Sequence, residues 1–136
     1  MLALGNPIKT RLQALPQLTG WQVRLGTELT DRRQVPAADV RMVGASMPSN
    51  RSTAAAVAPQ WVVTLIVRRS DTAAAELDAA FTAVIASLHN WLPGQHGGRG
   101  WEPLRAVGSA EAPFSDDGVA AFEINFSTQA LYAGQP

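Results

Sequence analysis

The sequence predicts a single α+β domain in which an antiparallel sheet of four to five strands carries two helices, packed mainly on one of its faces. Three observations lead to this prediction. Residues 60–68 form a strand-like run that is apolar on both faces. The one long helical pattern follows directly, at residues 72–92. Most of the remaining strand candidates alternate apolar and polar residues, which is typical of antiparallel strands with one face in water.

The strand at residues 60–68 is expected to lie in the middle of the sheet. Its apolar side chains divide between two faces, with Trp61, Val63, Leu65 and Val67 on one and Val62 and Ile66 on the other. A strand that is apolar on both faces, and rich in β-branched and aromatic residues, is typically covered on both sides. The run therefore predicts the central strand of the core.

The helix predicted at residues 72–92 has a cap, an apolar stripe and a stop. Ser70 or Asp71 can accept a hydrogen bond from its first free N–H groups, and Pro93 and Gly94 end it. The stripe consists of apolar residues at helical spacing: Leu77, Phe81, Val84, Ile85, Leu88 and Leu92. This face of the helix is expected to pack on the sheet.

The first third of the chain predicts one short helix and two strands. Asn6 and Pro7 suit the cap and the first position of a helix, which Pro16 ends. Residues 21–25 and 38–42 alternate apolar and polar side chains, as half-buried strands do. A polar loop joins these two strands.

Residues 44–59 show no periodicity, although they join two predicted strands. A connection of this length without a pattern is usually either disordered or functional. We therefore expect a loop that is mobile in the isolated protein and becomes ordered against a partner.

The last third of the chain alternates connectors and strands. Residues 94–100 are rich in glycine and predict a flexible connector, and residues 101–107 predict an edge strand. A polar loop at residues 108–118 contains the turn signal Asp116-Asp117-Gly118. Residues 122–132 alternate most clearly and predict the final strand, whose polar face meets water or a neighbouring subunit.

The composition describes an ordered globular protein. The 136 residues are 46% apolar and 16% charged and include no cysteine, which excludes disulfides and thiolate metal sites. No apolar run approaches a membrane span, and the N-terminal run is too short for a signal peptide, so we expect folding in the cytoplasm. The net charge of zero argues against a protein built to coat nucleic acid.

The charges are unevenly divided along the chain. Residues 1–69 hold nine basic and three acidic side chains, whereas residues 70–136 hold two basic and eight acidic ones. If the two halves interleave in space, these charges mix. If each half forms a flank of its own, the molecule suits head-to-tail contacts that close into a ring. The sequence leaves both arrangements open.

No residue pattern predicts catalysis, a metal site or a cofactor site. Gly44-Ala-Ser-Met-Pro48 lacks the second glycine of a nucleophile elbow. His89 and His96 are the only histidines and lack the spacing of metal ligands, so a structural role near the helix end is expected for His89. Residues 94–100 follow a helix instead of opening one, which argues against a phosphate-binding loop. We expect no enzyme.

Several segments together resemble the bacteriophage tail terminator proteins. These are Pro59–Arg68, the long helix that ends in Leu92-Pro93-Gly94, the segment Trp101-Glu-Pro-Leu-Arg105 and the final strand around residues 121–126 with its short polar tail. The similarity spans nearly the whole chain. It implies an α+β fold that assembles as a six-membered ring. In that family the ring sits on the end of the tail tube, stops further polymerisation and offers the surface to which the head connector joins.

The resemblance also implies partners and a location. The partners are further copies of the chain, the tail tube protein and the head–tail connector protein, and the location is the tail or neck of a virion assembled in the host cytoplasm. It implies no catalytic residue, no cofactor, no membrane and no specific nucleic-acid binding. Because they lie in or beside predicted loops, five residues are expected to make contacts with partners: Arg32, Arg33, Arg51, Arg99 and Trp101.

Three alternatives remain. Another phage neck or tail-completion protein would share the fold class and the ring but contact different partners. A small-ligand-binding or enzymatic α+β domain would have a polar pocket. A nucleic-acid-binding module would use a basic patch, and its binding would weaken steeply with salt; the candidate residues are Arg32, Arg33, Arg68 and Arg69.

Overall fold

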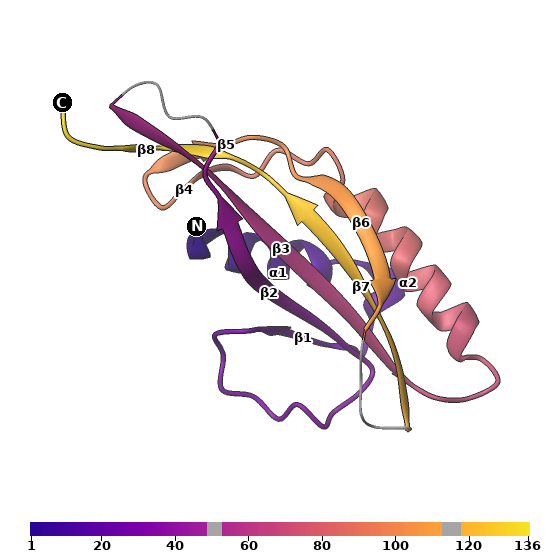
Figure 1. The fold of residues 1–136 in the computed structure, drawn as a ribbon. Helices are drawn as coiled ribbons and strands as arrows, with labels where there is room; N and C mark the ends of the chain where they lie inside the picture. The colour runs from indigo at the N-terminus through magenta and orange to yellow at the C-terminus, as the bar shows by residue number, and fades with distance from the viewer. Residues whose placement is uncertain (49–52, 113–117) are drawn as a thin grey trace.

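Strand β3 (Ala54–Arg68) runs through the centre of the fold (Figure 1). The computed structural model describes residues 1–48, 53–112 and 118–136. β3 pairs antiparallel with β2 (Ala37–Ser46) on one side and with β7 (Val119–Ser127) on the other. Its residues are buried on both faces, including Val62 and Ile66 on the face away from the helices. The prediction of a central strand is confirmed.

The main sheet has six strands and is mixed. Its order is β1-β2-β3-β7-β6, and β8 (Ala130–Ala133) pairs with the first residues of β3. β6 (Arg105–Glu111) is antiparallel to β7, whereas β1 (Gln22–Leu25) is parallel to β2. The α+β class is confirmed, but the sheet is not wholly antiparallel. Alternation in the sequence cannot report strand direction, because a half-buried strand alternates in either direction.

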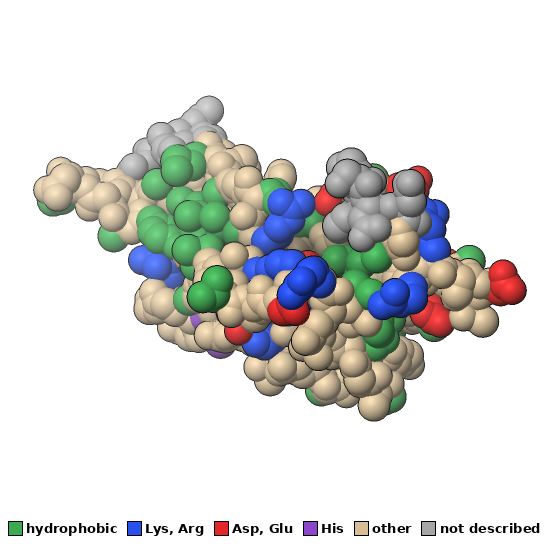
Figure 2. Space-filling model, turned by 90° about the horizontal axis from the view of Figure 1, so that it is seen from below, with side chains coloured by type: hydrophobic (Ala, Val, Ile, Leu, Met, Phe, Trp, Pro, Cys, Tyr) green, Lys and Arg blue, Asp and Glu red, His purple; other side chains and the backbone are tan. Residues whose placement is uncertain are grey.

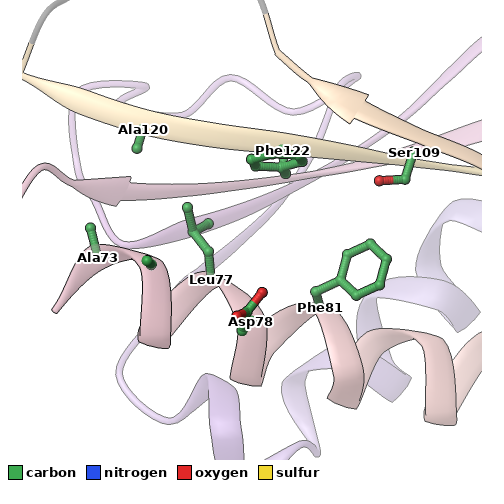
Figure 3. Close-up of a pocket in the computed structure, with 8 residues that line it drawn as sticks. Ala73, Leu77, Asp78, Phe81, Ser109, Ala120 and Phe122 are labelled. Atoms are coloured by element: carbon green, nitrogen blue, oxygen red, sulfur yellow. The ribbon is translucent and has the colours of Figure 1, made fainter.

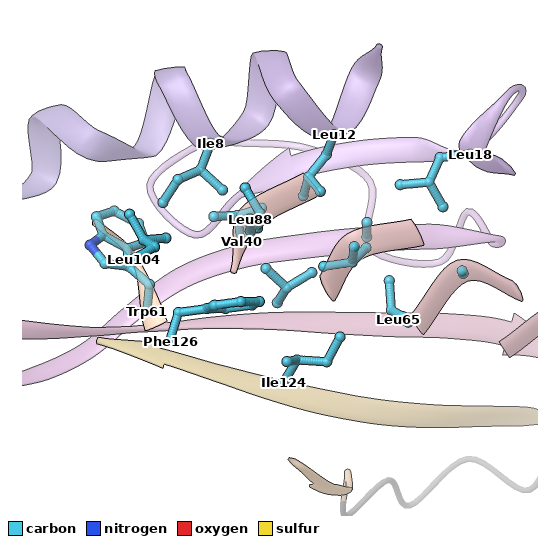
Figure 4. Packing of buried hydrophobic residues seen from close by; sticks show 14 of the residues in the cluster. Ile8, Leu12, Leu18, Val40, Trp61, Leu65, Leu88, Leu104, Ile124 and Phe126 are labelled. Carbon is cyan, nitrogen blue, oxygen red and sulfur yellow. The ribbon is translucent and has the colours of Figure 1, made fainter. Parts of the chain in front are cut away.

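The helices cover one face of the sheet, as predicted. The 3-10 turn η1 (Leu2–Leu4), α1 (Gly5–Gln13) and the 3-10 turn η2 (Pro16–Leu18) precede the sheet, and α2 (Ala73–Leu88) follows β3. The core lies between helices and sheet (Figure 4), and its large members include Ile8, Leu12, Leu88, Val63, Leu65, Ile124 and Phe126, all 0% exposed. Burying each such side chain contributes about 1.5–3 kcal/mol.

The starts of both helices differ from the prediction. α1 continues directly from η1, so Leu4 and not Asn6 occupies the cap position, and no side chain caps the helix. Before α2, the Ser70 hydroxyl accepts a hydrogen bond from the Thr72 N–H at 3.2 Å. The cap predicted for Asn6 is wrong. The cap predicted at Ser70 or Asp71 is not found either, because Thr72 is the cap residue of α2, Ser70 binds the Thr72 N–H, and no side chain caps the helix.

The end of α2 comes four residues earlier than Leu92, at Leu88. His89 leaves the helix in extended backbone, and its Nδ1 accepts a hydrogen bond from the Ala106 N–H at 3.0 Å. Asn90 then adopts a positive φ of 63°. The hydrogen bond between His89 and β6 therefore ends the helix before Pro93. As a result Leu92 lies outside the helix and is 61% exposed, whereas the predicted stripe places it in the core. The structural role predicted for His89 is present.

The stretch 44–59 is largely strand, which corrects the prediction of a patternless loop. β2 continues to Ser46, and β3 begins at Ala54 and pairs through Val57 with β8. Alanine and proline have low strand propensity, so only the pairing with β8 reveals this part of β3. Pro59 falls between the residues that pair with β8 and those that pair with β7, and on its other side it is the register partner of Ala45 in β2. The mobility of the segment stays a prediction, and residues 49–52 lie outside the described residues.

The glycine-rich segment 94–100 is a hairpin and not a flexible connector. β4 (Gly94–His96) pairs with β5 (Arg99–Trp101). Gly97 and Gly98 join them with φ values of 63° and 81°, and positive φ at both positions is what a tight type I′ turn requires. The edge strand predicted at residues 101–107 is therefore divided between β5 and β6.

The final strand predicted at residues 122–132 is divided between β7 and β8. The Thr128 hydroxyl donates a hydrogen bond to the Glu102 carbonyl at 2.5 Å, and the Glu102 N–H donates to the Gln129 carbonyl at 3.0 Å. These bonds hold the break between the two strands. The predicted polar loop 108–118 begins inside β6, and the turn at Asp116 and Asp117 lies outside the described residues.

Candidate interaction surfaces

One ring nitrogen of each histidine is bonded to the backbone. His89 is bonded to Ala106, and the Nε2 of His96 lies 2.8 Å from the Pro93 carbonyl. Within residues 1–48, 53–112 and 118–136, no three His, Asp or Glu side chains gather to hold a metal ion. Over the same residues, no helix is both long and apolar enough to cross a membrane. The remaining candidates for a functional role are surfaces that could contact another molecule.

The β1–β2 loop, residues 26–36, is built on a buried arginine that the sequence analysis did not single out. Arg24 is 2% exposed, and its Nη1 donates to the carbonyls of Asp31 at 2.8 Å and Gln34 at 3.1 Å. Arg24 also pairs with Asp39, its register partner on β2. The loop is thus held from inside, while Leu29 on it is fully exposed. The sequence alone does not reveal the Arg24–Asp39 pair, because the two residues become neighbours only through the register of β1 with β2.

The two arginines predicted as contact residues in this loop have different surroundings. Arg32 donates from Nη2 to the carbonyls of Leu25 at 2.9 Å and Glu28 at 3.1 Å. Its guanidinium therefore stabilises the loop from within. Arg33 has a 91% exposed side chain. The N–H and guanidinium of Arg33 lower the pKa of Asp31, to which both donate. Figure 2 shows Lys and Arg side chains gathered on this side of the molecule.

Arg99 and Trp101 pack together around Tyr132. The Arg99 guanidinium lies 3.6 Å from the centre of the Tyr132 ring and donates to the Gly97 carbonyl at 2.9 Å. Trp101 is 3% exposed, donates from Nε1 to the His96 carbonyl at 3.0 Å and meets Tyr132 edge to face. Trp101 is therefore a core residue that fixes the β4–β5 hairpin, and a partner can reach it only through its neighbours. Arg51, the remaining predicted contact residue, lies outside the described residues.

A groove of about 400 Å³ runs between α2 and the β6–β7 edge of the sheet (Figure 3). Leu77 and Phe81 line it from the helix, and Phe122 and Ser109 from the strands. Phe122 is 39% exposed, and Phe81 is half-buried, although the predicted stripe places Phe81 in the core. Exposed aromatic side chains in an apolar groove are typical of interaction sites. We name this feature the α2 groove.

A second cavity, of about 230 Å³, lies under the end of β2. Leu2, Met42 and Trp61 line it. The Nε1 of Trp61 is buried without a hydrogen-bond partner, which is uncommon for an indole N–H. Figure 2 shows a hydrophobic area at the end of the molecule where β2 finishes, and Val43 and Met47 there are 48% and 67% exposed.

The charged residues pair mostly within the first half of the chain. Of the five ion pairs among the described residues, only Arg41–Glu123, at 3.2 Å, joins the two halves. The backbone halves do interleave, because β7 pairs with β3. The sheet face away from the helices is polar in part, where Arg41 pairs with Glu123. Val62, Ile66 and Ala121 are apolar and buried on the same face.

The fold is similar to that of a solved virus-like assembly. A chain of the "Virion of native gene transfer agent (GTA) particle" superposes with a TM-score of 0.70 and 15% sequence identity, over 96% of this chain and 96% of that chain. At this identity the similarity establishes the fold alone. A second solved structure has a TM-score of 0.49 at 16% identity, over 98% of this chain and 91% of that one, and supports no argument. No protein-family model and no curated protein matches the sequence.

Proposed function

We propose that this chain is a structural protein of a phage-like particle. In this proposal it forms a six-membered ring that caps the tail tube, ends tail polymerisation and provides the surface for joining the head. The observation that carries the proposal is the similarity of fold, end to end, to a chain of a gene transfer agent virion. The resemblance of the sequence to tail terminators supplies the ring and its place on the tail.

The surfaces of the chain support an assembly role. The α2 groove is apolar and has aromatic walls, and the exposed apolar residues Val43 and Met47 lie at the end of β2. Two unlike surfaces on one chain suit head-to-tail contacts, which generate closed rings when the rotation between copies closes. Such contacts need no reaction chemistry and no cofactor.

The proposed contact residues divide into two roles. Arg33 is exposed and suits a direct contact with a neighbouring subunit or the tube. Arg32, Arg99 and Trp101 hold loops and hairpins in shape, so they act on partners through the segments that they support. Arg51 is proposed as a contact from its place in the sequence alone.

The mass of the protein in solution tests this proposal. Light scattering over a range of protein and salt concentrations is expected to show a six-fold mass, or a climb towards it. Added to polymerising tail tube protein, the ring is expected to stop elongation at one end. A monomer at every concentration that also leaves tube length unchanged would overturn the proposal.

A further inference from the structure

The two outer edges of the main sheet are open. β1 pairs with β2 only as far as Val40, and among the described residues no strand pairs with the outer side of residues 41–46. β6 pairs with β7 on one side, and in the described part of the chain no strand pairs with its other side. The Ala106 N–H is already bonded to His89, which leaves residues 107–111 as the open stretch. Open edges present unpaired backbone N–H and C=O groups that can pair with another strand.

The directions of the strands fit these two edges to each other. β2, β3, β7 and β6 are successively antiparallel, so β6 runs opposite to β2. When two copies meet edge to edge in the same orientation, β2 of one therefore lies antiparallel to β6 of the next. The open stretches are also similar in length. We propose that residues 41–46 of one copy pair with β6 of the next, an inference that rests on the proposed ring and identifies its contact.

The apolar side chains on the two edges are complementary. Met42 is the register partner of Trp61 and so lies on the helix-covered face of the sheet, and Val43 beside it is 48% exposed. The α2 groove lies on the same face, beside β6, with Ser109 of β6 in its wall. A neighbour's β2 paired to β6 brings its Met42 over the groove and towards Phe122. One contact then accounts for both the open edge and the exposed aromatic wall.

The charges select the antiparallel alignment. Arg41, whose side chain is 51% exposed, begins the open stretch of β2. Antiparallel pairing places it towards the end of β6 that carries Glu111. Arg41 lies on the sheet face away from the helices, where it already pairs with Glu123, whereas Glu111 is the register partner of Phe122 and lies on the helix-covered face. Parallel pairing would instead place Arg41 against Arg105, which lies on the same face as Arg41. Like charges therefore oppose the parallel alignment.

Both edges also carry a β-bulge, which is a device that many edge strands use to prevent pairing. The irregularities lie between Met42 and Gly44 in β2 and between Ala106 and Gly108 in β6. Gly44 is the register partner of Gln60 and Gly108 that of Asn125, so the two glycines lie on the same face of the sheet. The alternative to our proposal is that the bulges keep both edges free.

Cysteine cross-linking separates these alternatives. The chain has no cysteine of its own. A Cβ added at Gly44 or at Gly108 meets no atom within 4 Å, so both positions accept cysteine. Neighbouring positions on paired strands have Cβ atoms about 4.5–5.5 Å apart, close to the separation of about 3.5–4.5 Å that a disulfide requires. The full-length double variant Gly44→Cys/Gly108→Cys is oxidised and run on a denaturing, non-reducing gel.

The matched control is Gly44→Cys/Gly100→Cys. A Cβ at Gly100 meets only Gln95, at 3.9 Å, and Gly100 lies in β5, which belongs to the two-stranded sheet and not to the main sheet. We expect a ladder of covalent species for the first pair and at most a dimer for the control. Light scattering on the unsubstituted protein is measured in parallel.

The outcomes distinguish the two proposals. A ladder that stops at six copies supports both the edge pairing and the ring. A ladder that continues beyond six supports the edge pairing and overturns the ring. A six-fold mass for the unsubstituted protein, with no ladder above the control, overturns the edge pairing and leaves the ring. A monomeric protein without a ladder overturns the edge pairing, and it overturns the ring as well if the protein also leaves tube length unchanged.

Discussion

The guanidinium of Arg24 and the carboxylate of Asp39 form a two-point ion pair across the parallel strands β1 and β2. Nε lies 2.5 Å from Oδ1 and Nη2 lies 3.1 Å from Oδ2. The remaining nitrogen of Arg24 binds two carbonyls of the β1–β2 loop. One side chain therefore fixes the register of β1 and the shape of the loop together.

Replacing Arg24 by leucine is expected to destabilise the protein by about 3 kcal/mol. The substitution leaves Asp39 with only the longer contact to Arg32, at 3.5 Å, and removes the donor to the Asp31 and Gln34 carbonyls. Urea unfolding measures the change. Arg33→Gln is the matched control, since its exposed ion pair with Asp31 contributes little, with an expected change within about 0.5 kcal/mol. Equal stabilities for the two variants would show that the Arg24 pair does not hold the sheet edge.

Phe126→Ala and Phe81→Ala are expected to affect different properties. Phe126 is 0% exposed, so its loss is expected to cost about 3–5 kcal/mol of unfolding free energy. Phe81 is half-buried in the wall of the α2 groove, and its loss is expected to cost about 1–2 kcal/mol while weakening assembly. Denaturant unfolding and light scattering on both variants test this. If Phe81→Ala is as destabilising as Phe126→Ala, Phe81 belongs to the core.

Acid is expected to loosen the β1–β2 loop. The Leu25 N–H and Lys9 lower the pKa of Glu28 from its ordinary 4.5, and Arg33 lowers that of Asp31 from 3.8. A lowered folded-state pKa gives stability that is present above the ordinary value and is lost as the pH falls through the lowered one. The loop should therefore hold at pH 5 and lose this stability as the pH falls below the ordinary values of 4.5 and 3.8. Hydrogen exchange at the Leu25 and Arg33 amides, as a function of pH, measures it.

Glu28→Gln provides the control for this acid effect. Without the carboxylate, the Leu25 amide is expected to lose its dependence on acid pH, while the Arg33 amide keeps it through Asp31. Carboxyl resonances that titrate at 4.5 and 3.8 in the folded protein would contradict the prediction.

Arg33→Glu is expected to weaken ring formation without changing stability. The side chain of Arg33 is exposed, so reversing its charge alters contacts with partners far more than the fold. The comparison variant is Arg32→Glu, which also removes hydrogen bonds to the Leu25 and Glu28 carbonyls and should lower stability as well. Light scattering and urea unfolding give the two readouts. If the double variant Arg32→Glu/Arg33→Glu still assembles and caps the tube normally, neither residue belongs to the interface.

Much of the fold follows from local patterns. The β-branched run at residues 60–68 predicts the centre of β3, because an apolar strand can be buried on both faces. The stripe on residues 77–88 likewise predicts which face of α2 meets the sheet. The Gly97-Gly98 pair carries the signal of the β4–β5 turn, although its glycine-rich surroundings suggest a flexible segment instead.

The candidate sites were less predictable. The burial of Trp101 depends on Tyr132, which is distant in sequence. The α2 groove depends on how Phe122 and Phe81 approach from two elements. In both cases the two residues are far apart in the sequence, and the residues around one of them do not predict its contact with the other.

The sequence by itself determined the α+β class, the central strand, the helix that covers it and the absence of cysteine. Each of these depends on residue type and on local spacing. Only the tertiary structure decided that β1 is parallel to β2 and that alanines 54–56 extend β3. It also decided that, among the described residues, no strand pairs with the outer sides of residues 41–46 and 107–111. The physical reason is that strand pairing joins residues far apart along the chain, so its partners and directions have no local signature.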